Sequence, residues 1–161
     1  MNSKSKSDNL WEKIQVDENL VGNTLKLANR DLKTAENVFN DNDYDWAFAI
    51  SYNAMLQAGR ALMFSEGFRP KGAYKHVSVV EFVKTKFGKK FADNILFMFD
   101  KIRKKRHTAV YEQVNIISRE EAENAIKTAK EFVAKINELL ENKKPGNNGK
   151  GAENEKGQKV E

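Results

Sequence analysis

The segment Asp43–Pro70, DYDWAFAISYNAMLQAGRALMFSEGFRP, determines the fold, because it reads as one long apolar helix with a defined start and end. Asp43 can accept a hydrogen bond from an amide of the first turn, so it is a suitable N-cap. Gly67 supplies the left-handed residue on which many helices end, and Pro70 prevents continuation. Apolar residues lie on nearly every face between these signals, and such a helix is buried on several sides. We therefore expect this segment to be the central helix of an all-α domain.

Further helices are expected around the central one, from apolar residues that recur at three- and four-residue spacing. The first should lie antiparallel to the central helix, because the connection between them is short. The last begins at a capping box, in which Ser118 and Glu121 can satisfy each other's free amides. The expected ranges are approximately 20–39, 75–87, 89–106 and 118–140.

The two ends of the chain are expected to be disordered tails. Residues 1–10 are small, polar or charged, and residues 142–161 contain one valine and no aromatic residue. Such segments bury too little surface to offset the entropy lost on ordering. Residues 11–141 are therefore predicted to form one antiparallel bundle of four to five helices, with a short helical turn at 11–16 packed on it.

Composition narrows the classes of function. The 161 residues include no cysteine, which excludes disulfides, thiol catalysis and cysteine-ligated metals. There are two histidines and no evident carboxylate cluster, so we predict neither a metal site nor a cofactor. No apolar stretch is long enough to span a bilayer, and no signal-peptide region follows the first lysines. The sequence predicts a cytoplasmic protein that does not bind membranes.

Positive charge is concentrated in one part of the chain. Residues 84–106 carry nine basic and two acidic side chains, a net charge of +7, whereas residues 1–45 carry six basic and nine acidic ones. A local excess of this size attracts polyanions such as RNA, or the phosphate of a nucleotide. The alternative is a solvated helix face whose lysines are favoured by the helix dipole.

The segment Asp100–Glu112, DKIRKKRHTAVYE, is the most informative for chemistry. The planar guanidinium of Arg103 or Arg106 suits phosphate, and the imidazole of His107 titrates near neutral pH. Such groups together can handle a phosphodiester, although a basic helix end with one histidine is also typical of a solvated surface. The candidate phosphate-binding residues are Arg103, Lys104, Lys105, Arg106 and His76.

Several short motifs, taken in their order along the chain, resemble the HEPN family (higher eukaryotes and prokaryotes nucleotide-binding domain). The resemblance extends from about Leu20 to Leu140. It rests on Asp43-Tyr44-Asp45-Trp46-Ala47, Ser51-Tyr52-Asn53-Ala54-Met55, Gly67-Phe68-Arg69-Pro70, Lys75-His76, Arg106-His107 and Tyr111.

The resemblance implies a helical bundle that is commonly dimeric and often encoded beside a small nucleotidyltransferase. Catalytic members of the family are metal-independent ribonucleases that carry an arginine, a polar residue, three variable residues and a histidine. Arg106 and His107 match the first two positions, but Tyr111 stands where the final histidine is expected. A phenol with a pKa near 10 is a poor acid–base group at neutral pH. The resemblance also implies a contact of His76 near Arg106; a capping or packed histidine is the alternative.

The leading hypothesis is therefore a HEPN-like homodimer that binds RNA or a nucleotide phosphate, and a nucleotidyltransferase partner, in a toxin–antitoxin-type module. Arg106, His107 and Tyr111 would lie along a groove at the twofold axis. An alternative is an endoribonuclease that uses Arg106 and His107. A further alternative is a purely structural helical adaptor. For Tyr111 itself, the alternative to a role in the site is a ring that packs in the bundle while its hydroxyl reaches a polar partner.

Overall fold

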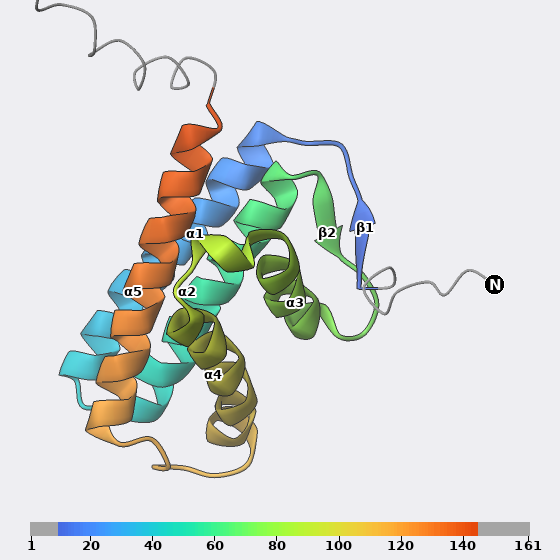
Figure 1. Cartoon of the computed structure of the whole chain (residues 1–161). Coiled ribbons are helices and arrows are strands. Elements are labelled where there is room, and N and C mark those ends of the chain that lie inside the picture. The colour runs from blue at the N-terminus through green and yellow to red at the C-terminus, as the bar shows by residue number, and fades with distance from the viewer. Residues whose placement is uncertain (1–9, 145–161) are drawn as a thin grey trace, which may run out of the picture.

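The computed structural model describes residues 10–144 as a bundle of five α-helices with one two-stranded sheet. Helices α1 (Glu18–Asn40) and α2 (Tyr44–Ser65) form an antiparallel hairpin, and α5 (Arg119–Asn142) packs along both. Figure 1 shows these three long helices side by side, with α3 (Lys75–Phe87) and α4 (Asp93–Tyr111) on one side of them. The predicted tails, except for Leu10 and residues 142–144, lie outside the described residues.

The central position of α2 is confirmed. It contacts every other helix, and most of its buried residues have almost no exposed surface. Its start is also as predicted, because an Asp43 carboxylate oxygen accepts a hydrogen bond from the Trp46 amide at 3.3 Å. The helix ends just before Gly67, which has a φ of 79°. Local capping signals therefore fixed both ends of the helix that organises the core.

The predicted helical turn at residues 11–16 is wrong. Residues Trp11–Lys13 form strand β1, which pairs antiparallel with β2 (Phe68–Pro70), and Trp11 lies opposite Pro70. The Ile14 amide extends this pairing by donating to the Gly67 carbonyl at 2.9 Å. The ring of Trp11 meets Phe82 of α3 edge-on, with centroids 5.3 Å apart. The extended form prevails because a distant segment supplies its hydrogen bonds, which local sequence does not reveal.

Helix α4 is displaced along the chain relative to the expected range. A 3-10 turn occupies Gly88–Lys90, and α4 begins at Asp93 and continues to Tyr111 instead of ending at Arg106. Phe91, which is buried, follows this turn in an extended conformation and so separates it from α4. As a result, the predicted site residues from Arg103 to Tyr111 all lie on one helix.

The loop between α4 and α5 is held by a carboxylate of α2. Asp45 accepts hydrogen bonds from the amides of Asn115 at 2.5 Å and Ile117 at 3.0 Å. Ser118 then caps α5 by accepting from the Glu121 amide at 3.1 Å, as predicted. The Glu121 side chain pairs with Lys105 of α4, and this contact, together with hydrogen bonding to Ser118, lowers the pKa of Glu121. Among residues 10–144, no helix has the length and apolar character to cross a bilayer.

Candidate functional site

The predicted site residues of α4 divide into two groups by their burial and their contacts. Arg103 and Arg106 are half-buried and turn towards α2 and α3. His107 and Tyr111 are exposed, and their rings lie 5.2 Å apart. Consecutive residues on a helix point about 100° apart, which explains why neighbours Arg106 and His107 separate.

The inner group is built around Tyr52 of α2. The hydroxyl of this fully buried tyrosine lies 3.0 Å from Nδ1 of His76, in the first turn of α3. Cζ of Arg106 lies 5.5 Å from the centre of the Tyr52 ring. We call Tyr52, His76 and Arg106 the Tyr52 cluster. It joins three helices and brings together two residues that the sequence singled out, His76 and Arg106.

Arg106 is the least satisfied residue of the Tyr52 cluster. Its Nε is the single buried side-chain nitrogen or oxygen in residues 10–144 that lacks a hydrogen-bond partner. No carboxylate within the described chain forms an ion pair with its guanidinium. A cation over the face of an aromatic ring is stabilised by the ring quadrupole, so Tyr52 holds Arg106 without neutralising it. The charge of Arg106 is therefore not compensated by any ion pair with residues 10–144.

The two other side chains of the Tyr52 cluster, Tyr52 and His76, are held in their neutral forms beside Arg106. Burial raises the pKa of Tyr52, so its hydroxyl stays protonated. Burial lowers the pKa of His76, and the positive charges of Arg106 and Arg103 lower it further. The imidazole is therefore neutral at pH 7 and can accept a proton or a hydrogen bond.

The other predicted phosphate-binding cations have acidic partners. Asp100 lies 3.0 Å from Arg103 and 3.1 Å from Lys104, and Lys105 pairs with Glu121 of α5. Burial alone would raise the pKa of Asp100, but hydrogen bonds from Lys104 and Arg103 outweigh it and lower the pKa. Arg103, Lys104 and Lys105 thus have acidic partners within the bundle, whereas Arg106 has none among residues 10–144.

The outer group contains His107, Tyr111 and Glu112. The imidazole Nε2 of His107 lies 3.6 Å from a carboxylate oxygen of Glu112. Tyr111 is 68% exposed, so the alternative in which its ring packs inside the bundle is wrong. The helix extends through Tyr111, which places its ring on the solvent side of the last turn.

Sequence reasoning missed Tyr52 as a site residue, because it stands in the middle of an apolar helix. One signal was available: the hydroxyl of a tyrosine buried at such a position needs a polar partner. Its partner is 24 positions away, which no local pattern indicates. Residues 10–144 contain no group of three or more histidine, cysteine, aspartate or glutamate side chains that could hold a metal ion.

Three comparisons relate the chain to known proteins. A curated relative from Methanocaldococcus jannaschii, named "Putative toxin MJ0142", is 30% identical over 122 residues, covering 72% of this chain and 78% of the relative. The crystal structure of TT1696 from Thermus thermophilus shares the fold with a TM-score of 0.59 and 17% identity, over 73% of this chain and 96% of that one. The family model described as HEPN domain matches residues 22–139. The chain therefore belongs to the HEPN domain family.

Proposed function

We propose that this HEPN protein is a cytoplasmic, toxin-like RNA-binding protein in which Arg106 holds a backbone phosphate beside His76. The observation that carries the proposal is the guanidinium of Arg106, with a buried Nε that has no partner and no ion pair in the described chain. A phosphate oxygen at the terminal nitrogens of Arg106 would compensate the charge of this guanidinium, which no described carboxylate does. The toxin name of the Methanocaldococcus relative supports the same role.

The geometry favours phosphate binding over base recognition. Arg106 offers its planar fork from a rigid helix, and the Tyr52 ring holds that fork in place. His76 adds a neutral imidazole that contacts the Tyr52 hydroxyl and is near enough to Arg106 for that charge to lower its pKa. Tyr52 itself is fully buried, so it cannot stack on a base. Contacts of this type bind RNA through its backbone and carry little sequence information.

A nucleotidyltransferase partner and a homodimer are part of the same proposal, and they rest mainly on the family resemblance. Two large apolar side chains on α4 support a protein partner, since Phe97 is 66% exposed and Tyr111 is 68% exposed. Burial of such side chains is a main favourable term in protein association. Light scattering of the purified protein, alone and with a nucleotidyltransferase encoded beside it, tests both associations.

A metal-independent endoribonuclease is the second candidate, and one observation favours it with His76 in the role expected for His107. His76 lies in the Tyr52 cluster with Arg106, whereas His107 lies on the solvent side with Tyr111 and Glu112. A neutral imidazole near a bound phosphate can accept the proton of an attacking 2′-hydroxyl. Arg106 would stabilise the charge that develops on the phosphate.

RNA-binding measurements at several salt concentrations test the leading proposal. Affinity should fall as salt rises, because each phosphate contact releases counterions. Arg106→Ala should weaken binding and reduce the salt slope by about 0.7 for single-stranded RNA. Lys101→Ala is the matched control, because Lys101 is an exposed cation of α4 with no ion pair among the described residues. An equal loss of RNA affinity in both variants would mean that Arg106 contributes only general surface charge, and it would contradict the proposal.

Incubation of structured RNA with the protein in EDTA tests the second candidate. If the chain is a nuclease of the proposed kind, cleavage is lost in Arg106→Ala and in His76→Gln but persists in His107→Gln. Loss of cleavage in His107→Gln, with cleavage retained in His76→Gln, would assign the acid–base role to His107. No cleavage at high protein concentration would exclude the nuclease and leave RNA binding unaffected.

A further inference from the structure

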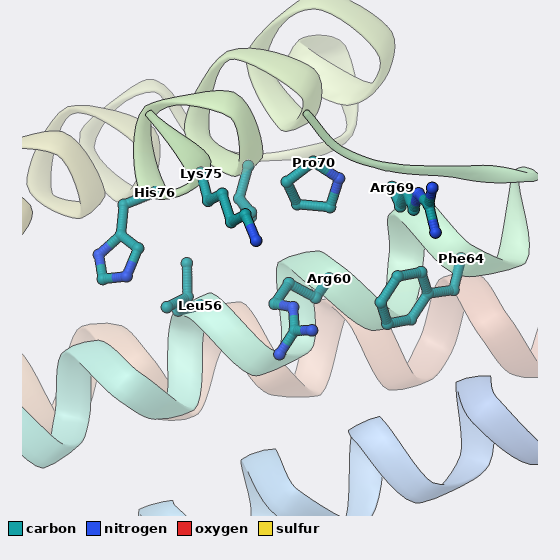
Figure 2. Close-up of a pocket in the computed structure, with 8 residues that line it drawn as sticks. Leu56, Arg60, Phe64, Arg69, Pro70, Lys75 and His76 are labelled. Atoms are coloured by element: carbon teal, nitrogen blue, oxygen red, sulfur yellow. The ribbon is translucent and has the colours of Figure 1, made fainter. Parts of the chain in front are cut away.

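We propose that a pocket between α2, β2 and α3, next to the Tyr52 cluster, binds a phosphomonoester, carried either by a free mononucleotide or by the 5′ end of an RNA. This inference goes beyond the proposed function, because the pocket draws its charge from residues outside α4. The cavity measures about 340 Å³, and Figure 2 shows the side chains that line it. Four of them are basic: Arg60, Arg69, Lys75 and His76.

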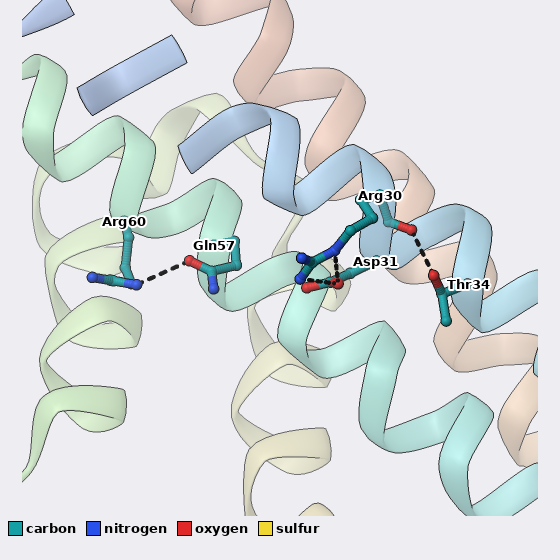
Figure 3. A network of polar contacts seen from close by, with 5 residues as sticks. All are labelled: Arg30, Asp31, Thr34, Gln57 and Arg60. Carbon is teal, nitrogen blue, oxygen red and sulfur yellow. Dashed lines mark hydrogen bonds and ion pairs between the residues drawn. The ribbon is translucent and has the colours of Figure 1, made fainter. Parts of the chain in front are cut away.

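Among residues 10–144, no carboxylate lines the pocket, so its charge is only partly compensated. Arg60 donates from Nη1 to the side-chain oxygen of Gln57 at 3.0 Å (Figure 3), and this neutral partner orients the guanidinium without cancelling its charge. Lys75 forms no ion pair or hydrogen bond through its side chain with residues 10–144, and Figure 2 shows it reaching into the space above Arg60. These two cations therefore stand uncompensated on opposite walls.

Arg69 is the exception, because it has an acidic partner outside the pocket. Its Nε donates to Glu12 of β1 at 2.6 Å, across the β1–β2 pair. With Arg69 offset by Glu12, the fixed charge of the pocket is close to +2 from Arg60 and Lys75. A phosphomonoester carries about −1.5 to −2 at pH 7, whereas a phosphodiester carries −1. The charge of the pocket therefore matches the monoester better.

The start of α3 adds to the preference for an anion. Lys75 and His76 occupy the first turn of this 13-residue helix, which has no acidic residue there and no side-chain cap from Tyr74. The positive charge of Lys75 at the positive end of a helix dipole is unfavourable, and a bound anion would offset it. By contrast, α1, α2 and α5 begin with side-chain caps and an acidic residue in the first turn.

The remaining wall of the pocket is apolar and gives the ligand a second contact surface. It consists of Leu56, Phe64, Pro70 and Val79. Arg60 also lies over the Phe64 ring, with Cζ 5.4 Å from its centre, so the cationic and apolar walls meet at one edge. Small-molecule sites usually combine apolar walls with a few charged groups that fix orientation. A phosphate joined to a sugar and a planar base fits this division.

Titration calorimetry with adenosine 5′-monophosphate, adenosine and inorganic phosphate tests the proposal on the full chain. The monophosphate should bind, adenosine should not, and phosphate should bind more weakly than the monophosphate. Lys75→Ala and Arg60→Gln should each weaken binding about tenfold or more, because each removes a charge-assisted contact. Lys71→Ala is the control, because Lys71 is an exposed cation of the neighbouring loop that does not line the pocket.

A pair of oligonucleotides that differ only in a 5′-phosphate or 5′-hydroxyl distinguishes the two sources of the monoester. Tighter binding of the 5′-phosphate form assigns the pocket to an RNA end, and binding of the mononucleotide alone assigns it to a free nucleotide. Arg106→Ala separates this site from the proposed α4 contact, because it should reduce RNA binding but leave monophosphate affinity within about twofold.

Three results would overturn the inference. The first is binding of adenosine as tight as that of the monophosphate. The second is no binding of either the monophosphate or the phosphorylated oligonucleotide at millimolar concentration. The third is an equal loss of monophosphate affinity in Lys71→Ala and Lys75→Ala, which would indicate a general attraction of the anion to the positively charged surface. Thermal melts of each variant confirm that the fold is retained, and Lys75 is exposed, so its truncation leaves the core intact.

Discussion

Replacing Gly59 with alanine tests the packing that sets the spacing between α2 and α3. A Cβ atom at position 59 would lie 2.5 Å from Cγ1 of Val79 and 3.7 Å from Cγ2 of Val83. Val79 has no exposed surface and its branched side chain has one strongly preferred rotamer in a helix, so it cannot swing aside. The two helices must therefore move apart to accept Gly59→Ala.

The expected cost follows from two opposing effects. Overpacking of a well-filled core costs typically 1–3 kcal/mol, and a contact this short belongs in the upper half of that range, about 2–3 kcal/mol. Replacing glycine by alanine inside a helix returns about 1 kcal/mol. The net loss should be about 1–2 kcal/mol, which lowers the melting temperature of a chain of this size by roughly 2–8 °C.

Urea unfolding and thermal melts followed by circular dichroism measure this loss, with Gly22→Ala as the matched control. A Cβ atom at Gly22 of α1 meets nothing within 4 Å, so this substitution should stabilise the protein by about 0.5–1 kcal/mol. The two glycine-to-alanine changes are thus predicted to have opposite signs. If Gly59→Ala stabilises the protein as much as Gly22→Ala does, the close approach of α2 and α3 is wrong.

Two further predictions concern single polar groups. Asp45→Asn should destabilise the protein by about 1–3 kcal/mol and speed amide exchange at Ile117, because the Asp45 carboxylate accepts hydrogen bonds from two loop amides. Asp43→Asn is the control and should change the stability little, because asparagine is also a good N-cap. Equal effects of the two substitutions would contradict the role of Asp45. Burial and nearby arginines lower the pKa of His76 below 6.5, so below about pH 6.5 the unfolded chain binds more protons and the free energy of unfolding falls as pH falls. Urea titrations from pH 8 to 5 should lose that slope in His76→Gln but retain it in His107→Gln; an unchanged slope in His76→Gln would refute the assignment.

The parts of the fold that depend on local signals could be predicted from sequence. Asp43 and Ser118 act as N-caps because capping involves only residues of the same turn, and the apolar character of α2 reports its burial directly. Strand β1 could not be predicted in the same way. Its three residues take their conformation from β2, more than fifty positions later, and without that partner a helical turn is an equally reasonable interpretation.

The candidate site was predictable in its residue types but not in its geometry. Arg106 and His76 were identified from the sequence, and the structure brings them to either side of Tyr52. The pairing of Arg106 with His107 was a natural assumption from adjacency, yet helix geometry turns adjacent side chains to different faces. Ion pairs between α4 and α5, such as Lys105 with Glu121, also changed the charge available at the surface.

The β1–β2 pair has a consequence for the order of folding. It joins Glu12 and Arg69, residues 57 positions apart, through strands of only three residues. Closing so long a loop in an unfolded chain costs more entropy than such short strands recover. Once α1 and α2 have formed their hairpin, however, the two segments already lie at the same end. We therefore expect the sheet to form after the folding transition state, so that it slows unfolding without speeding folding.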